Sequence, residues 1–191
     1  MTKRLIAVAV CLVLFYPTAT PALGKKKQGK PVQERFSAAA PSISGTTEAM
    51  DIAIEEYTSD EEMDGLRKVF EAGGQEALDK VLSKIEKGFY KTKEGFTMPL
   101  LIIQSRPEGA GRILQMVGKA RSDFAAYGGI VLNAEVKGYP YAFFQLNVDE
   151  KGVGTGRAIL HGSLAFSKEG HIVAKPSHSG YVPLTNVRLE K

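Results

Sequence analysis

Hydrophobic and polar residues alternate with a period of two between Met50 and Glu55. This alternation is typical of a strand that is buried on one face. The pattern ends at Thr58. Ser59 and Glu62 then have the spacing of a capping box, in which each side chain bonds the backbone N–H of the other residue. The chain is therefore predicted to pass from a strand into a helix that begins after Ser59.

Two stretches with helical periodicity follow, and the pair Gly73–Gly74 separates them. Glycine is common immediately after the last turn of a helix. In both stretches, apolar residues recur three and four positions apart and so share one face of a helix. They are Met63, Leu66, Val69 and Phe70 in the first stretch and Leu78, Val81, Leu82 and Ile85 in the second. The pattern predicts a helical hairpin made of two helices.

The second half of the chain is predicted to form mainly strands. Pro99 favours an edge position for the first of these strands. Residues 113–124 fit a helix as well as a strand, and we interpret them as a strand followed by an irregular segment. Successive hairpins then predict an α+β fold, an antiparallel β-sheet with the helical hairpin packed on one face. The apolar runs that support it lie at 98–104, 141–148, 157–166, 172–174 and 182–189.

Residues 1–24 have the three-part pattern of a secretory signal peptide. Lys3 and Arg4 precede an apolar run from Leu5 to Tyr16, and cleavage is expected after Ala22 or Gly24. The apolar run is shorter than the roughly 20 residues that span a bilayer. We therefore expect an exported protein, periplasmic or extracellular after cleavage, with an uncleaved anchor as the alternative.

The single cysteine, Cys11, lies inside this apolar run. A lipidated cysteine is expected to end the apolar core of its signal, whereas apolar residues continue beyond Cys11. Lipidation is therefore not predicted. The mature chain is expected to contain no cysteine, which excludes disulfide bonds and cysteine-based metal sites or nucleophiles.

Basic residues are concentrated directly after the signal peptide. The chain has a formal net charge of +4, yet acidic residues outnumber basic ones from Phe36 onward. A nucleic-acid-binding domain is therefore not predicted. A flexible leader, residues 25–46, contains the basic cluster, which is either a solvated tail or a site of weak contact with an anionic membrane or cell-wall surface. Its members are Lys25, Lys26, Lys27 and Lys30. Residues 37–47 are interpreted as a linker or a weak first strand.

Aromatic residues are densest between residues 139 and 144. The interpretation that needs no ligand is packing in the core and the sheet, because strands favour aromatic residues. The functional alternative is a groove for a peptide, glycan or lipid. The candidate ligand-binding residues of this groove are Tyr139, Tyr141 and Phe143.

No cofactor, metal site or catalytic site is predicted. The acidic residues from Glu55 to Asp64 lack the spacing of a calcium loop. The glycines of Gly152–Gly156 lack the spacing of a nucleotide-binding loop and favour positive φ or a bulge at a hairpin. No serine lies in the Gly-x-Ser-x-Gly pattern of many hydrolases. The histidines lack the spacing of a zinc site, and they are His161, His171 and His178.

Several short motifs support a resemblance. They are TSDEE at 58–62, GGQEAL at 73–78, GYPY at 138–141, DEKGVGTG at 149–156 and VPLTNVR at 182–188. On these motifs, the chain resembles a group of uncharacterised secreted bacterial proteins of similar length, over roughly residues 47–191. The resemblance implies export and a single α+β domain. It implies no activity and no site residues.

These features predict a signal peptide at 1–24, the leader at 25–46 and one α+β domain at 47–191. The expected function is that of a non-enzymatic binding or interaction domain of the bacterial cell envelope, with an envelope protein or a small ligand as its partner. The first alternative is a carrier that holds a small apolar ligand between the helices and the sheet. The second is a hydrolase that uses His161 or His178.

Overall fold

The computed structural model describes residues 30–41, 47–92, 95–120, 138–167, 169–177 and 181–190. In these residues, every strand pairing is antiparallel. Helix α1 spans Asp60–Leu82. The strands are β1 (Glu34–Pro41), β2 (Thr47–Ile54), β3 (Gly88–Thr92), β4 (Thr97–Glu108), β5 (Gly111–Lys119), β6 (Tyr141–Val148), β7 (Val153–Phe166), β8 (Ile172–Pro176) and β9 (Val182–Glu190).

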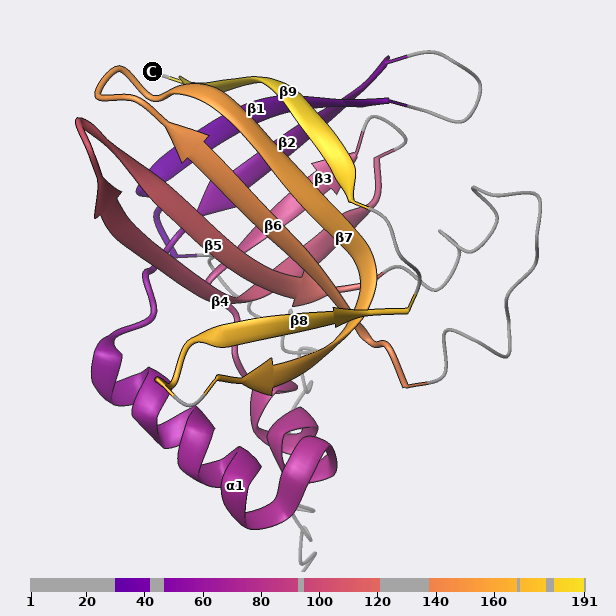
Figure 1. The fold of residues 1–191 in the computed structure, drawn as a ribbon. Helices are drawn as coiled ribbons and strands as arrows, with labels where there is room; N and C mark the ends of the chain where they lie inside the picture. Colours follow the sequence, from indigo (N-terminus) through magenta and orange to yellow (C-terminus); the bar gives the residue numbers. More distant parts are fainter. Residues whose placement is uncertain are drawn as a thin grey trace, which may run out of the picture.

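The sheet closes into a barrel because β9 pairs with both β7 and β1 (Figure 1). Val153 of β7 lies opposite Arg188, and Phe36 of β1 lies opposite Leu189. The order β1–β2–β3–β4–β5–β6–β7–β9 therefore returns to β1 and forms an eight-stranded antiparallel barrel. β8 lies outside this ring and pairs with the last part of β7. Closure removes the free edges of the eight ring strands.

The predicted α+β fold, a sheet with a helical hairpin on one face, is wrong. The protein is a mainly β barrel with one helix. Alternation of apolar residues shows which faces of a strand are buried, but it does not show that the first and last strands pair with each other. The two predicted helices form one element, α1, whose backbone leaves the helical conformation at Gly74, with φ 63° and ψ −157°.

One strand of the barrel was missed by the sequence pattern, and another was given only as a weak alternative to a linker. β1 lies inside the segment that the sequence assigned to the leader, and it pairs along its whole length with β2. Its small residues Ala38 and Ala40 give a weak hydrophobic signal, although both face the interior. β3, at Gly88–Thr92, is too short to produce a clear period. The edge position expected from Pro99 is also wrong, because β4 pairs with both β3 and β5.

Several local predictions are confirmed. Ser59 is the N-cap of α1, and the capping box is complete, with Glu62 N–H donating to Ser59 Oγ at 3.2 Å and Ser59 N–H donating to Glu62 Oε2 at 2.9 Å. β6 has the predicted bounds of 141–148. β5 confirms the strand interpretation for the first part of the ambiguous segment 113–124, and residues 121–124 lie outside the described residues.

Inward-facing side chains fill most of the barrel. Tyr90 and Phe144 lie against each other, with ring centroids 4.8 Å apart. Phe36, Leu114 and Leu146 are completely buried around them. The Tyr90 hydroxyl donates a hydrogen bond of 2.7 Å to a backbone carbonyl of β5, so this buried polar group is satisfied.

An ion pair closes one end of the barrel. Arg112 of β5 donates two hydrogen bonds to the carboxylate of Glu34 at the start of β1, at 3.1 and 2.5 Å. The same guanidinium lies 3.4 Å from the hydroxyl of Tyr57 and 5.8 Å from the centre of the Phe36 ring. Burial, followed by the charge of Glu34, raises the pKa of Tyr57 to about 12. This cluster is called the plug.

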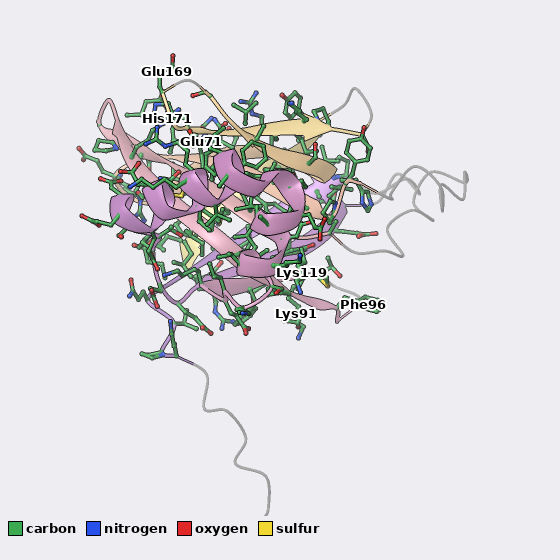
Figure 2. All side chains as sticks on the ribbon, turned by 90° about the horizontal axis from the view of Figure 1, so that it is seen from below. Glu71, Lys91, Phe96, Lys119, Glu169 and His171 are labelled. Carbon is green, nitrogen blue, oxygen red and sulfur yellow. The ribbon has the colours of Figure 1, made fainter. Side chains whose placement is uncertain are left out.

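A second core lies outside the barrel, under α1. β4 is buried on both faces, with Leu100 and Ile103 in the interior core and Leu101 and Ile102 in the outer one. Residues of α1 such as Leu78 and of β8 such as Ile172 complete the outer core. Figure 2 looks onto α1, which lies across the outside of the strands. The helix is therefore part of the folded unit, because it covers an apolar outer wall that water would otherwise contact.

Candidate functional site

The end of the barrel opposite the plug contains a pocket of about 240 Å³. We call it the mouth pocket. It reaches the surface at Pro41 and Ala49, which are exposed, and its deeper wall consists of buried side chains of the interior core such as Met50 and Leu184. Its lining residues are Ala40, Pro41, Glu48, Ala49, Met50, Thr92, Ala158, Leu160, Val182 and Leu184.

Small inward-facing residues create this space. Ala40 and Ala158 each contribute only a methyl group to the interior. Elsewhere in the barrel, Phe36 and Phe144 contribute aromatic rings. Five strands, β1, β2, β3, β7 and β9, supply the wall. Because these strands are hydrogen-bonded to one another in a closed ring, the pocket is held by rigid backbone.

Two polar side chains lie among the apolar lining. Glu48 pairs with Ala40 across β1 and β2, and Thr92 pairs with Met50 across β2 and β3. Thr92 is buried, at 5% exposure. The mouth pocket therefore combines an apolar wall with a carboxylate and a hydroxyl, which is the usual composition of a pocket for a small organic molecule.

An exposed aromatic ring follows Thr92 directly. Phe96 is 45% exposed in the turn between β3 and β4, and its backbone carbonyl accepts a hydrogen bond of 3.2 Å from the Thr92 N–H. In Figure 2, Phe96 lies at the same edge of the molecule as Lys91 and Lys119, and Glu169 and His171 lie at the opposite edge. The mouth end thus presents an apolar ring and two exposed lysines to solvent.

A second pocket, also of about 240 Å³, lies on the outside of the barrel beside β8. We call it the β8 groove. The outer faces of β5, β6 and β7 form its floor, and β8 forms one wall. Its lining residues are Gln115, Met116, Val117, Phe143, Phe144, Gln145, Arg157, Ile159, Ile172, Val173, Ala174 and Tyr181.

Two further depressions lie where α1 meets the barrel. One, of about 400 Å³, includes Asp79 and Tyr141, and the other, of about 300 Å³, includes Leu66 and Lys87. Both occupy the region between helix and sheet that the carrier hypothesis predicted for a ligand. The mouth pocket is more enclosed than either, because it lies within the ring of strands rather than beside it.

Lys87 is the most buried charged residue described near α1. Its side chain is 6% exposed and its ammonium group contacts the carboxylates of Glu56 and Glu62, the latter at 2.7 Å. Hydrogen bonds from Lys30 and Lys87 lower the pKa of Glu56 to about 2. Burial opposes the charge of Lys87, but its hydrogen bonds to the two carboxylates outweigh burial and raise its pKa. This cluster joins the start of α1 to the segment before β3, so it is structural.

The three predicted ligand-binding residues do not share one pocket. Tyr139 is half-buried, whereas Tyr141 and Phe143 are buried, at 3% and 7% exposure. Tyr141 lines a depression beside α1 and donates a hydrogen bond to Asp79, and Phe143 lies on the floor of the β8 groove. Burial, followed by this hydrogen bond, raises the pKa of Tyr141. Ligand binding at these residues stays a prediction.

The basic leader is described only from Lys30 onward. Lys25, Lys26 and Lys27 lie outside the described residues, as does the signal peptide. Lys30 forms an ion pair with Glu56. Contact of these lysines with an anionic surface stays a prediction.

The histidines are separated in the structure. His161 is half-buried on β7, His171 is exposed before β8, and His178 lies outside the described residues. Within the part of the chain that is described, no group of three or more His, Cys, Asp or Glu side chains is placed to hold a metal ion.

The glycine motifs have structural roles. Gly152 has a φ of 75° in the turn between β6 and β7, as predicted for that hairpin. A Cβ on Gly154 would lie 1.8 Å from the carbonyl oxygen of Asn147, so only glycine fits there. Gln75, which follows Gly73–Gly74, donates a hydrogen bond of 2.7 Å to Asp79 on α1. These contacts account for both motifs without a bound ligand.

Sequence reasoning missed the mouth pocket. Its apolar residues lie on strands far apart in the chain, and alanines such as Ala40 and Ala158 give little signal in a hydrophobic pattern. The one available clue was the run of alanines at 38–40 beside a serine- and proline-containing segment, which the sequence analysis assigned to the leader.

Comparison of the chain with protein-family models, curated proteins and solved structures finds no match. The resemblance to secreted bacterial proteins therefore stays a prediction. No helix in the described part of the chain is long and apolar enough to cross a membrane.

Proposed function

We propose that this protein binds a small apolar ligand in the mouth pocket and acts as its carrier. The observation that supports this is an apolar pocket of about 240 Å³ inside a barrel that is otherwise filled with side chains and closed at its other end by the plug. The proposed ligand site lies within the barrel. The sequence-based carrier hypothesis instead placed the ligand between the helices and the sheet. Export, expected from residues 1–24, would make it a carrier outside the cytoplasm.

The volume limits the size of the ligand. A dry cavity of about 150 Å³ holds a benzene molecule. By the same proportion, the mouth pocket accommodates on the order of ten non-hydrogen atoms, so it suits a bicyclic aromatic compound or a short alkyl chain.

The polar lining limits its chemistry. A ligand whose polar end is an anion is disfavoured, because no Lys or Arg is among the described residues that line the mouth pocket, and a buried charge without a partner is costly. A neutral molecule, or one whose polar end is a hydrogen-bond donor, fits better beside Glu48 and Thr92. We therefore propose a neutral or donor-bearing apolar compound as the ligand class.

The direct test measures the binding of three probes of matched size, and methyl NMR of the labelled protein reports the binding. The probes are naphthalene, 2-naphthol and 2-naphthoate. Naphthalene and 2-naphthol are expected to shift the methyl signals of Met50, Leu160 and Leu184. The anionic 2-naphthoate is expected to bind about tenfold more weakly or worse. Equal binding of all three probes would contradict the proposed ligand class.

A matched pair of variants tests the location. Ala40→Phe places a ring in the mouth pocket, whereas Ala39→Phe places the same ring on the outer face of β1, because neighbouring residues of a strand point to opposite faces. Ala40→Phe is expected to abolish naphthalene binding, and Ala39→Phe to leave it unchanged. Binding that survives Ala40→Phe would place the ligand elsewhere and overturn the proposal.

The interaction-domain hypothesis stays a proposal of lower rank. Native mass spectrometry of the protein recovered from its producing cell distinguishes the interaction-domain hypothesis from the carrier hypothesis. A small extra mass that is lost on denaturation supports the carrier, whereas co-purification of a protein partner without such a mass supports the interaction domain.

A further inference from the structure

β8 has one edge that no described strand covers. It pairs with β7 along residues 172–176, and no other pairing of β8 occurs among the described residues. All the other strands belong to the closed ring. A free edge exposes backbone N–H and C=O groups that can pair with an added strand.

The ladder shows which groups are free. Ser167 N–H donates to His171 O at 2.8 Å, and Ser177 N–H donates to His161 O at 3.0 Å, so these pairs mark the two ends of the β7–β8 ladder. In an antiparallel pair, every second residue bonds to the partner strand. Val173 and Lys175 therefore bond to β7. The intervening residues direct their N–H and C=O groups away from β7, and they are Ile172 and Ala174.

The free edge borders the β8 groove. Ile172 and Ala174 both line this groove. Its floor includes apolar side chains of the barrel wall, among them Phe143 and Ile159, which are 7% and 6% exposed. An extended chain beside β8 would therefore meet backbone partners on one side and apolar side chains beneath it.

A cation that pairs with no described carboxylate lies in the same groove. Arg157 lies over the ring of Tyr181, 4.7 Å from its centre, and donates a hydrogen bond of 2.9 Å to Gln145. No carboxylate among the described residues forms an ion pair with Arg157. Tyr181 is 57% exposed. The guanidinium is thus held in place by an aromatic ring and an amide, with donor capacity left for a carboxylate.

We propose that the β8 groove binds an extended, acidic segment of a partner protein, which pairs with Ile172 and Ala174 and places a carboxylate on Arg157. The segment is short, because Pro176 has no N–H and ends the usable edge. The exposed Lys175 on β8 favours the same acidic partner. This site is separate from the mouth pocket and is independent of the proposed carrier function.

The test uses the full-length protein labelled with ¹⁵N and an acetylated, amidated pentapeptide of sequence Val-Glu-Val-Glu-Val. The peptide is expected to shift the amide signals of residues 172–174 and to slow hydrogen exchange at Ile172 and Ala174. The matched peptide Val-Lys-Val-Lys-Val is expected to bind at least about tenfold more weakly. Equal binding of the two peptides, or shifts confined to the mouth pocket, would overturn the proposal.

Two pairs of variants separate the backbone contribution from the charge. Ala174→Pro removes an N–H that does not bond β7, and proline is tolerated at such edge positions, whereas Ala174→Ser keeps the N–H. Arg157→Gln removes the charge, whereas Arg157→Lys keeps it. Ala174→Pro and Arg157→Gln are each expected to weaken peptide binding about tenfold. Unchanged binding in both would refute the site.

The two proposals fail separately. Ala40→Phe is expected to abolish naphthalene binding while leaving the affinity for the acidic peptide unchanged. A peptide affinity that falls with Ala40→Phe would show that the peptide uses the mouth pocket, and the β8 groove would then have no assigned role.

Discussion

Arg112 and Glu34 lie 78 positions apart in the sequence, yet they form a doubly hydrogen-bonded ion pair at one end of the barrel. Their side chains are 28% and 24% exposed. A partly buried pair of this kind adds little net stability compared with apolar residues, but removing one partner leaves the other charge without compensation.

The plug is therefore expected to behave as a coupled unit. Glu34→Leu and Arg112→Leu are each expected to lower the free energy of unfolding by about 2 kcal/mol, and the double variant by clearly less than the sum. Urea unfolding of the four proteins measures the coupling. Strict additivity would show that the two side chains do not interact in solution.

Acid is expected to destabilise the protein through the cluster around Lys87. The pKa of Glu56 is lowered to about 2 by its hydrogen bonds to Lys30 and Lys87, and the pKa of Glu62 is lowered by Lys87. The unfolded chain binds protons on these carboxylates at a higher pH than the folded chain does. Their contribution to the free energy of unfolding is thus complete above about pH 5, and it is lost as the pH falls toward about 2.

The acid effect is measured as the melting temperature of the wild type and of Glu56→Gln between pH 7 and pH 2. The variant is expected to be less stable than the wild type at pH 7 and to converge with it near pH 2. Glu76→Gln is the control, because Glu76 and its partner Lys80 are 83% and 73% exposed and such pairs contribute little. Parallel pH curves for the wild type and Glu56→Gln would contradict this prediction.

Two glycines of α1 are expected to respond in opposite ways to alanine. Gly74 has a positive φ of 63° and a ψ of −157°, and a Cβ there would meet no atom within 4 Å. Gly74→Ala is therefore expected to cost about 1–3 kcal/mol through backbone strain alone. Gly65 lies in the helix with the same open surroundings, so Gly65→Ala is expected to stabilise by up to about 1 kcal/mol. Thermal unfolding distinguishes the two variants. Equal shifts of their melting temperatures would show that the break in the helix at Gly74 is absent.

The N-cap of α1 is expected to contribute measurably to stability. Ser59→Ala removes the acceptor of the Glu62 N–H and is expected to cost about 1 kcal/mol. Ser59→Asp keeps an acceptor at the cap and is expected to restore most of the loss. Chemical denaturation measures both. If aspartate fails to restore stability, the serine acts through some contact other than capping.

Local structure followed closely from the sequence. The capping box at Ser59 and Glu62, the break at Gly73–Gly74 and the turn at 149–152 each depend on residues that are adjacent or nearly adjacent in the chain. Interactions of that range are encoded by short motifs, so the pattern alone was enough to place them.

The fold class did not follow from the sequence, because closure of the barrel depends on the long-range pairing of β1 with β9. Ser37 on β1 and Glu190 on β9 are hydrogen-bonded across 153 positions of sequence, and no periodicity within a strand specifies its partner. β4 shows the same limit. Its run of apolar residues is compatible with any doubly covered strand, and only the tertiary structure shows that one face meets the barrel interior and the other meets α1.

The sequence by itself thus determined most of the strand segments, though not β1 or β3, and where the helix begins, since these depend on the alternation and spacing of near neighbours. Only the tertiary structure decided that the strands close into a barrel, that Ala40 and Ala158 leave a pocket at its mouth, and that Ile172 and Ala174 face a groove with Arg157. Those features arise where distant strands meet, and the space between side chains depends on the register and volume of every strand around it.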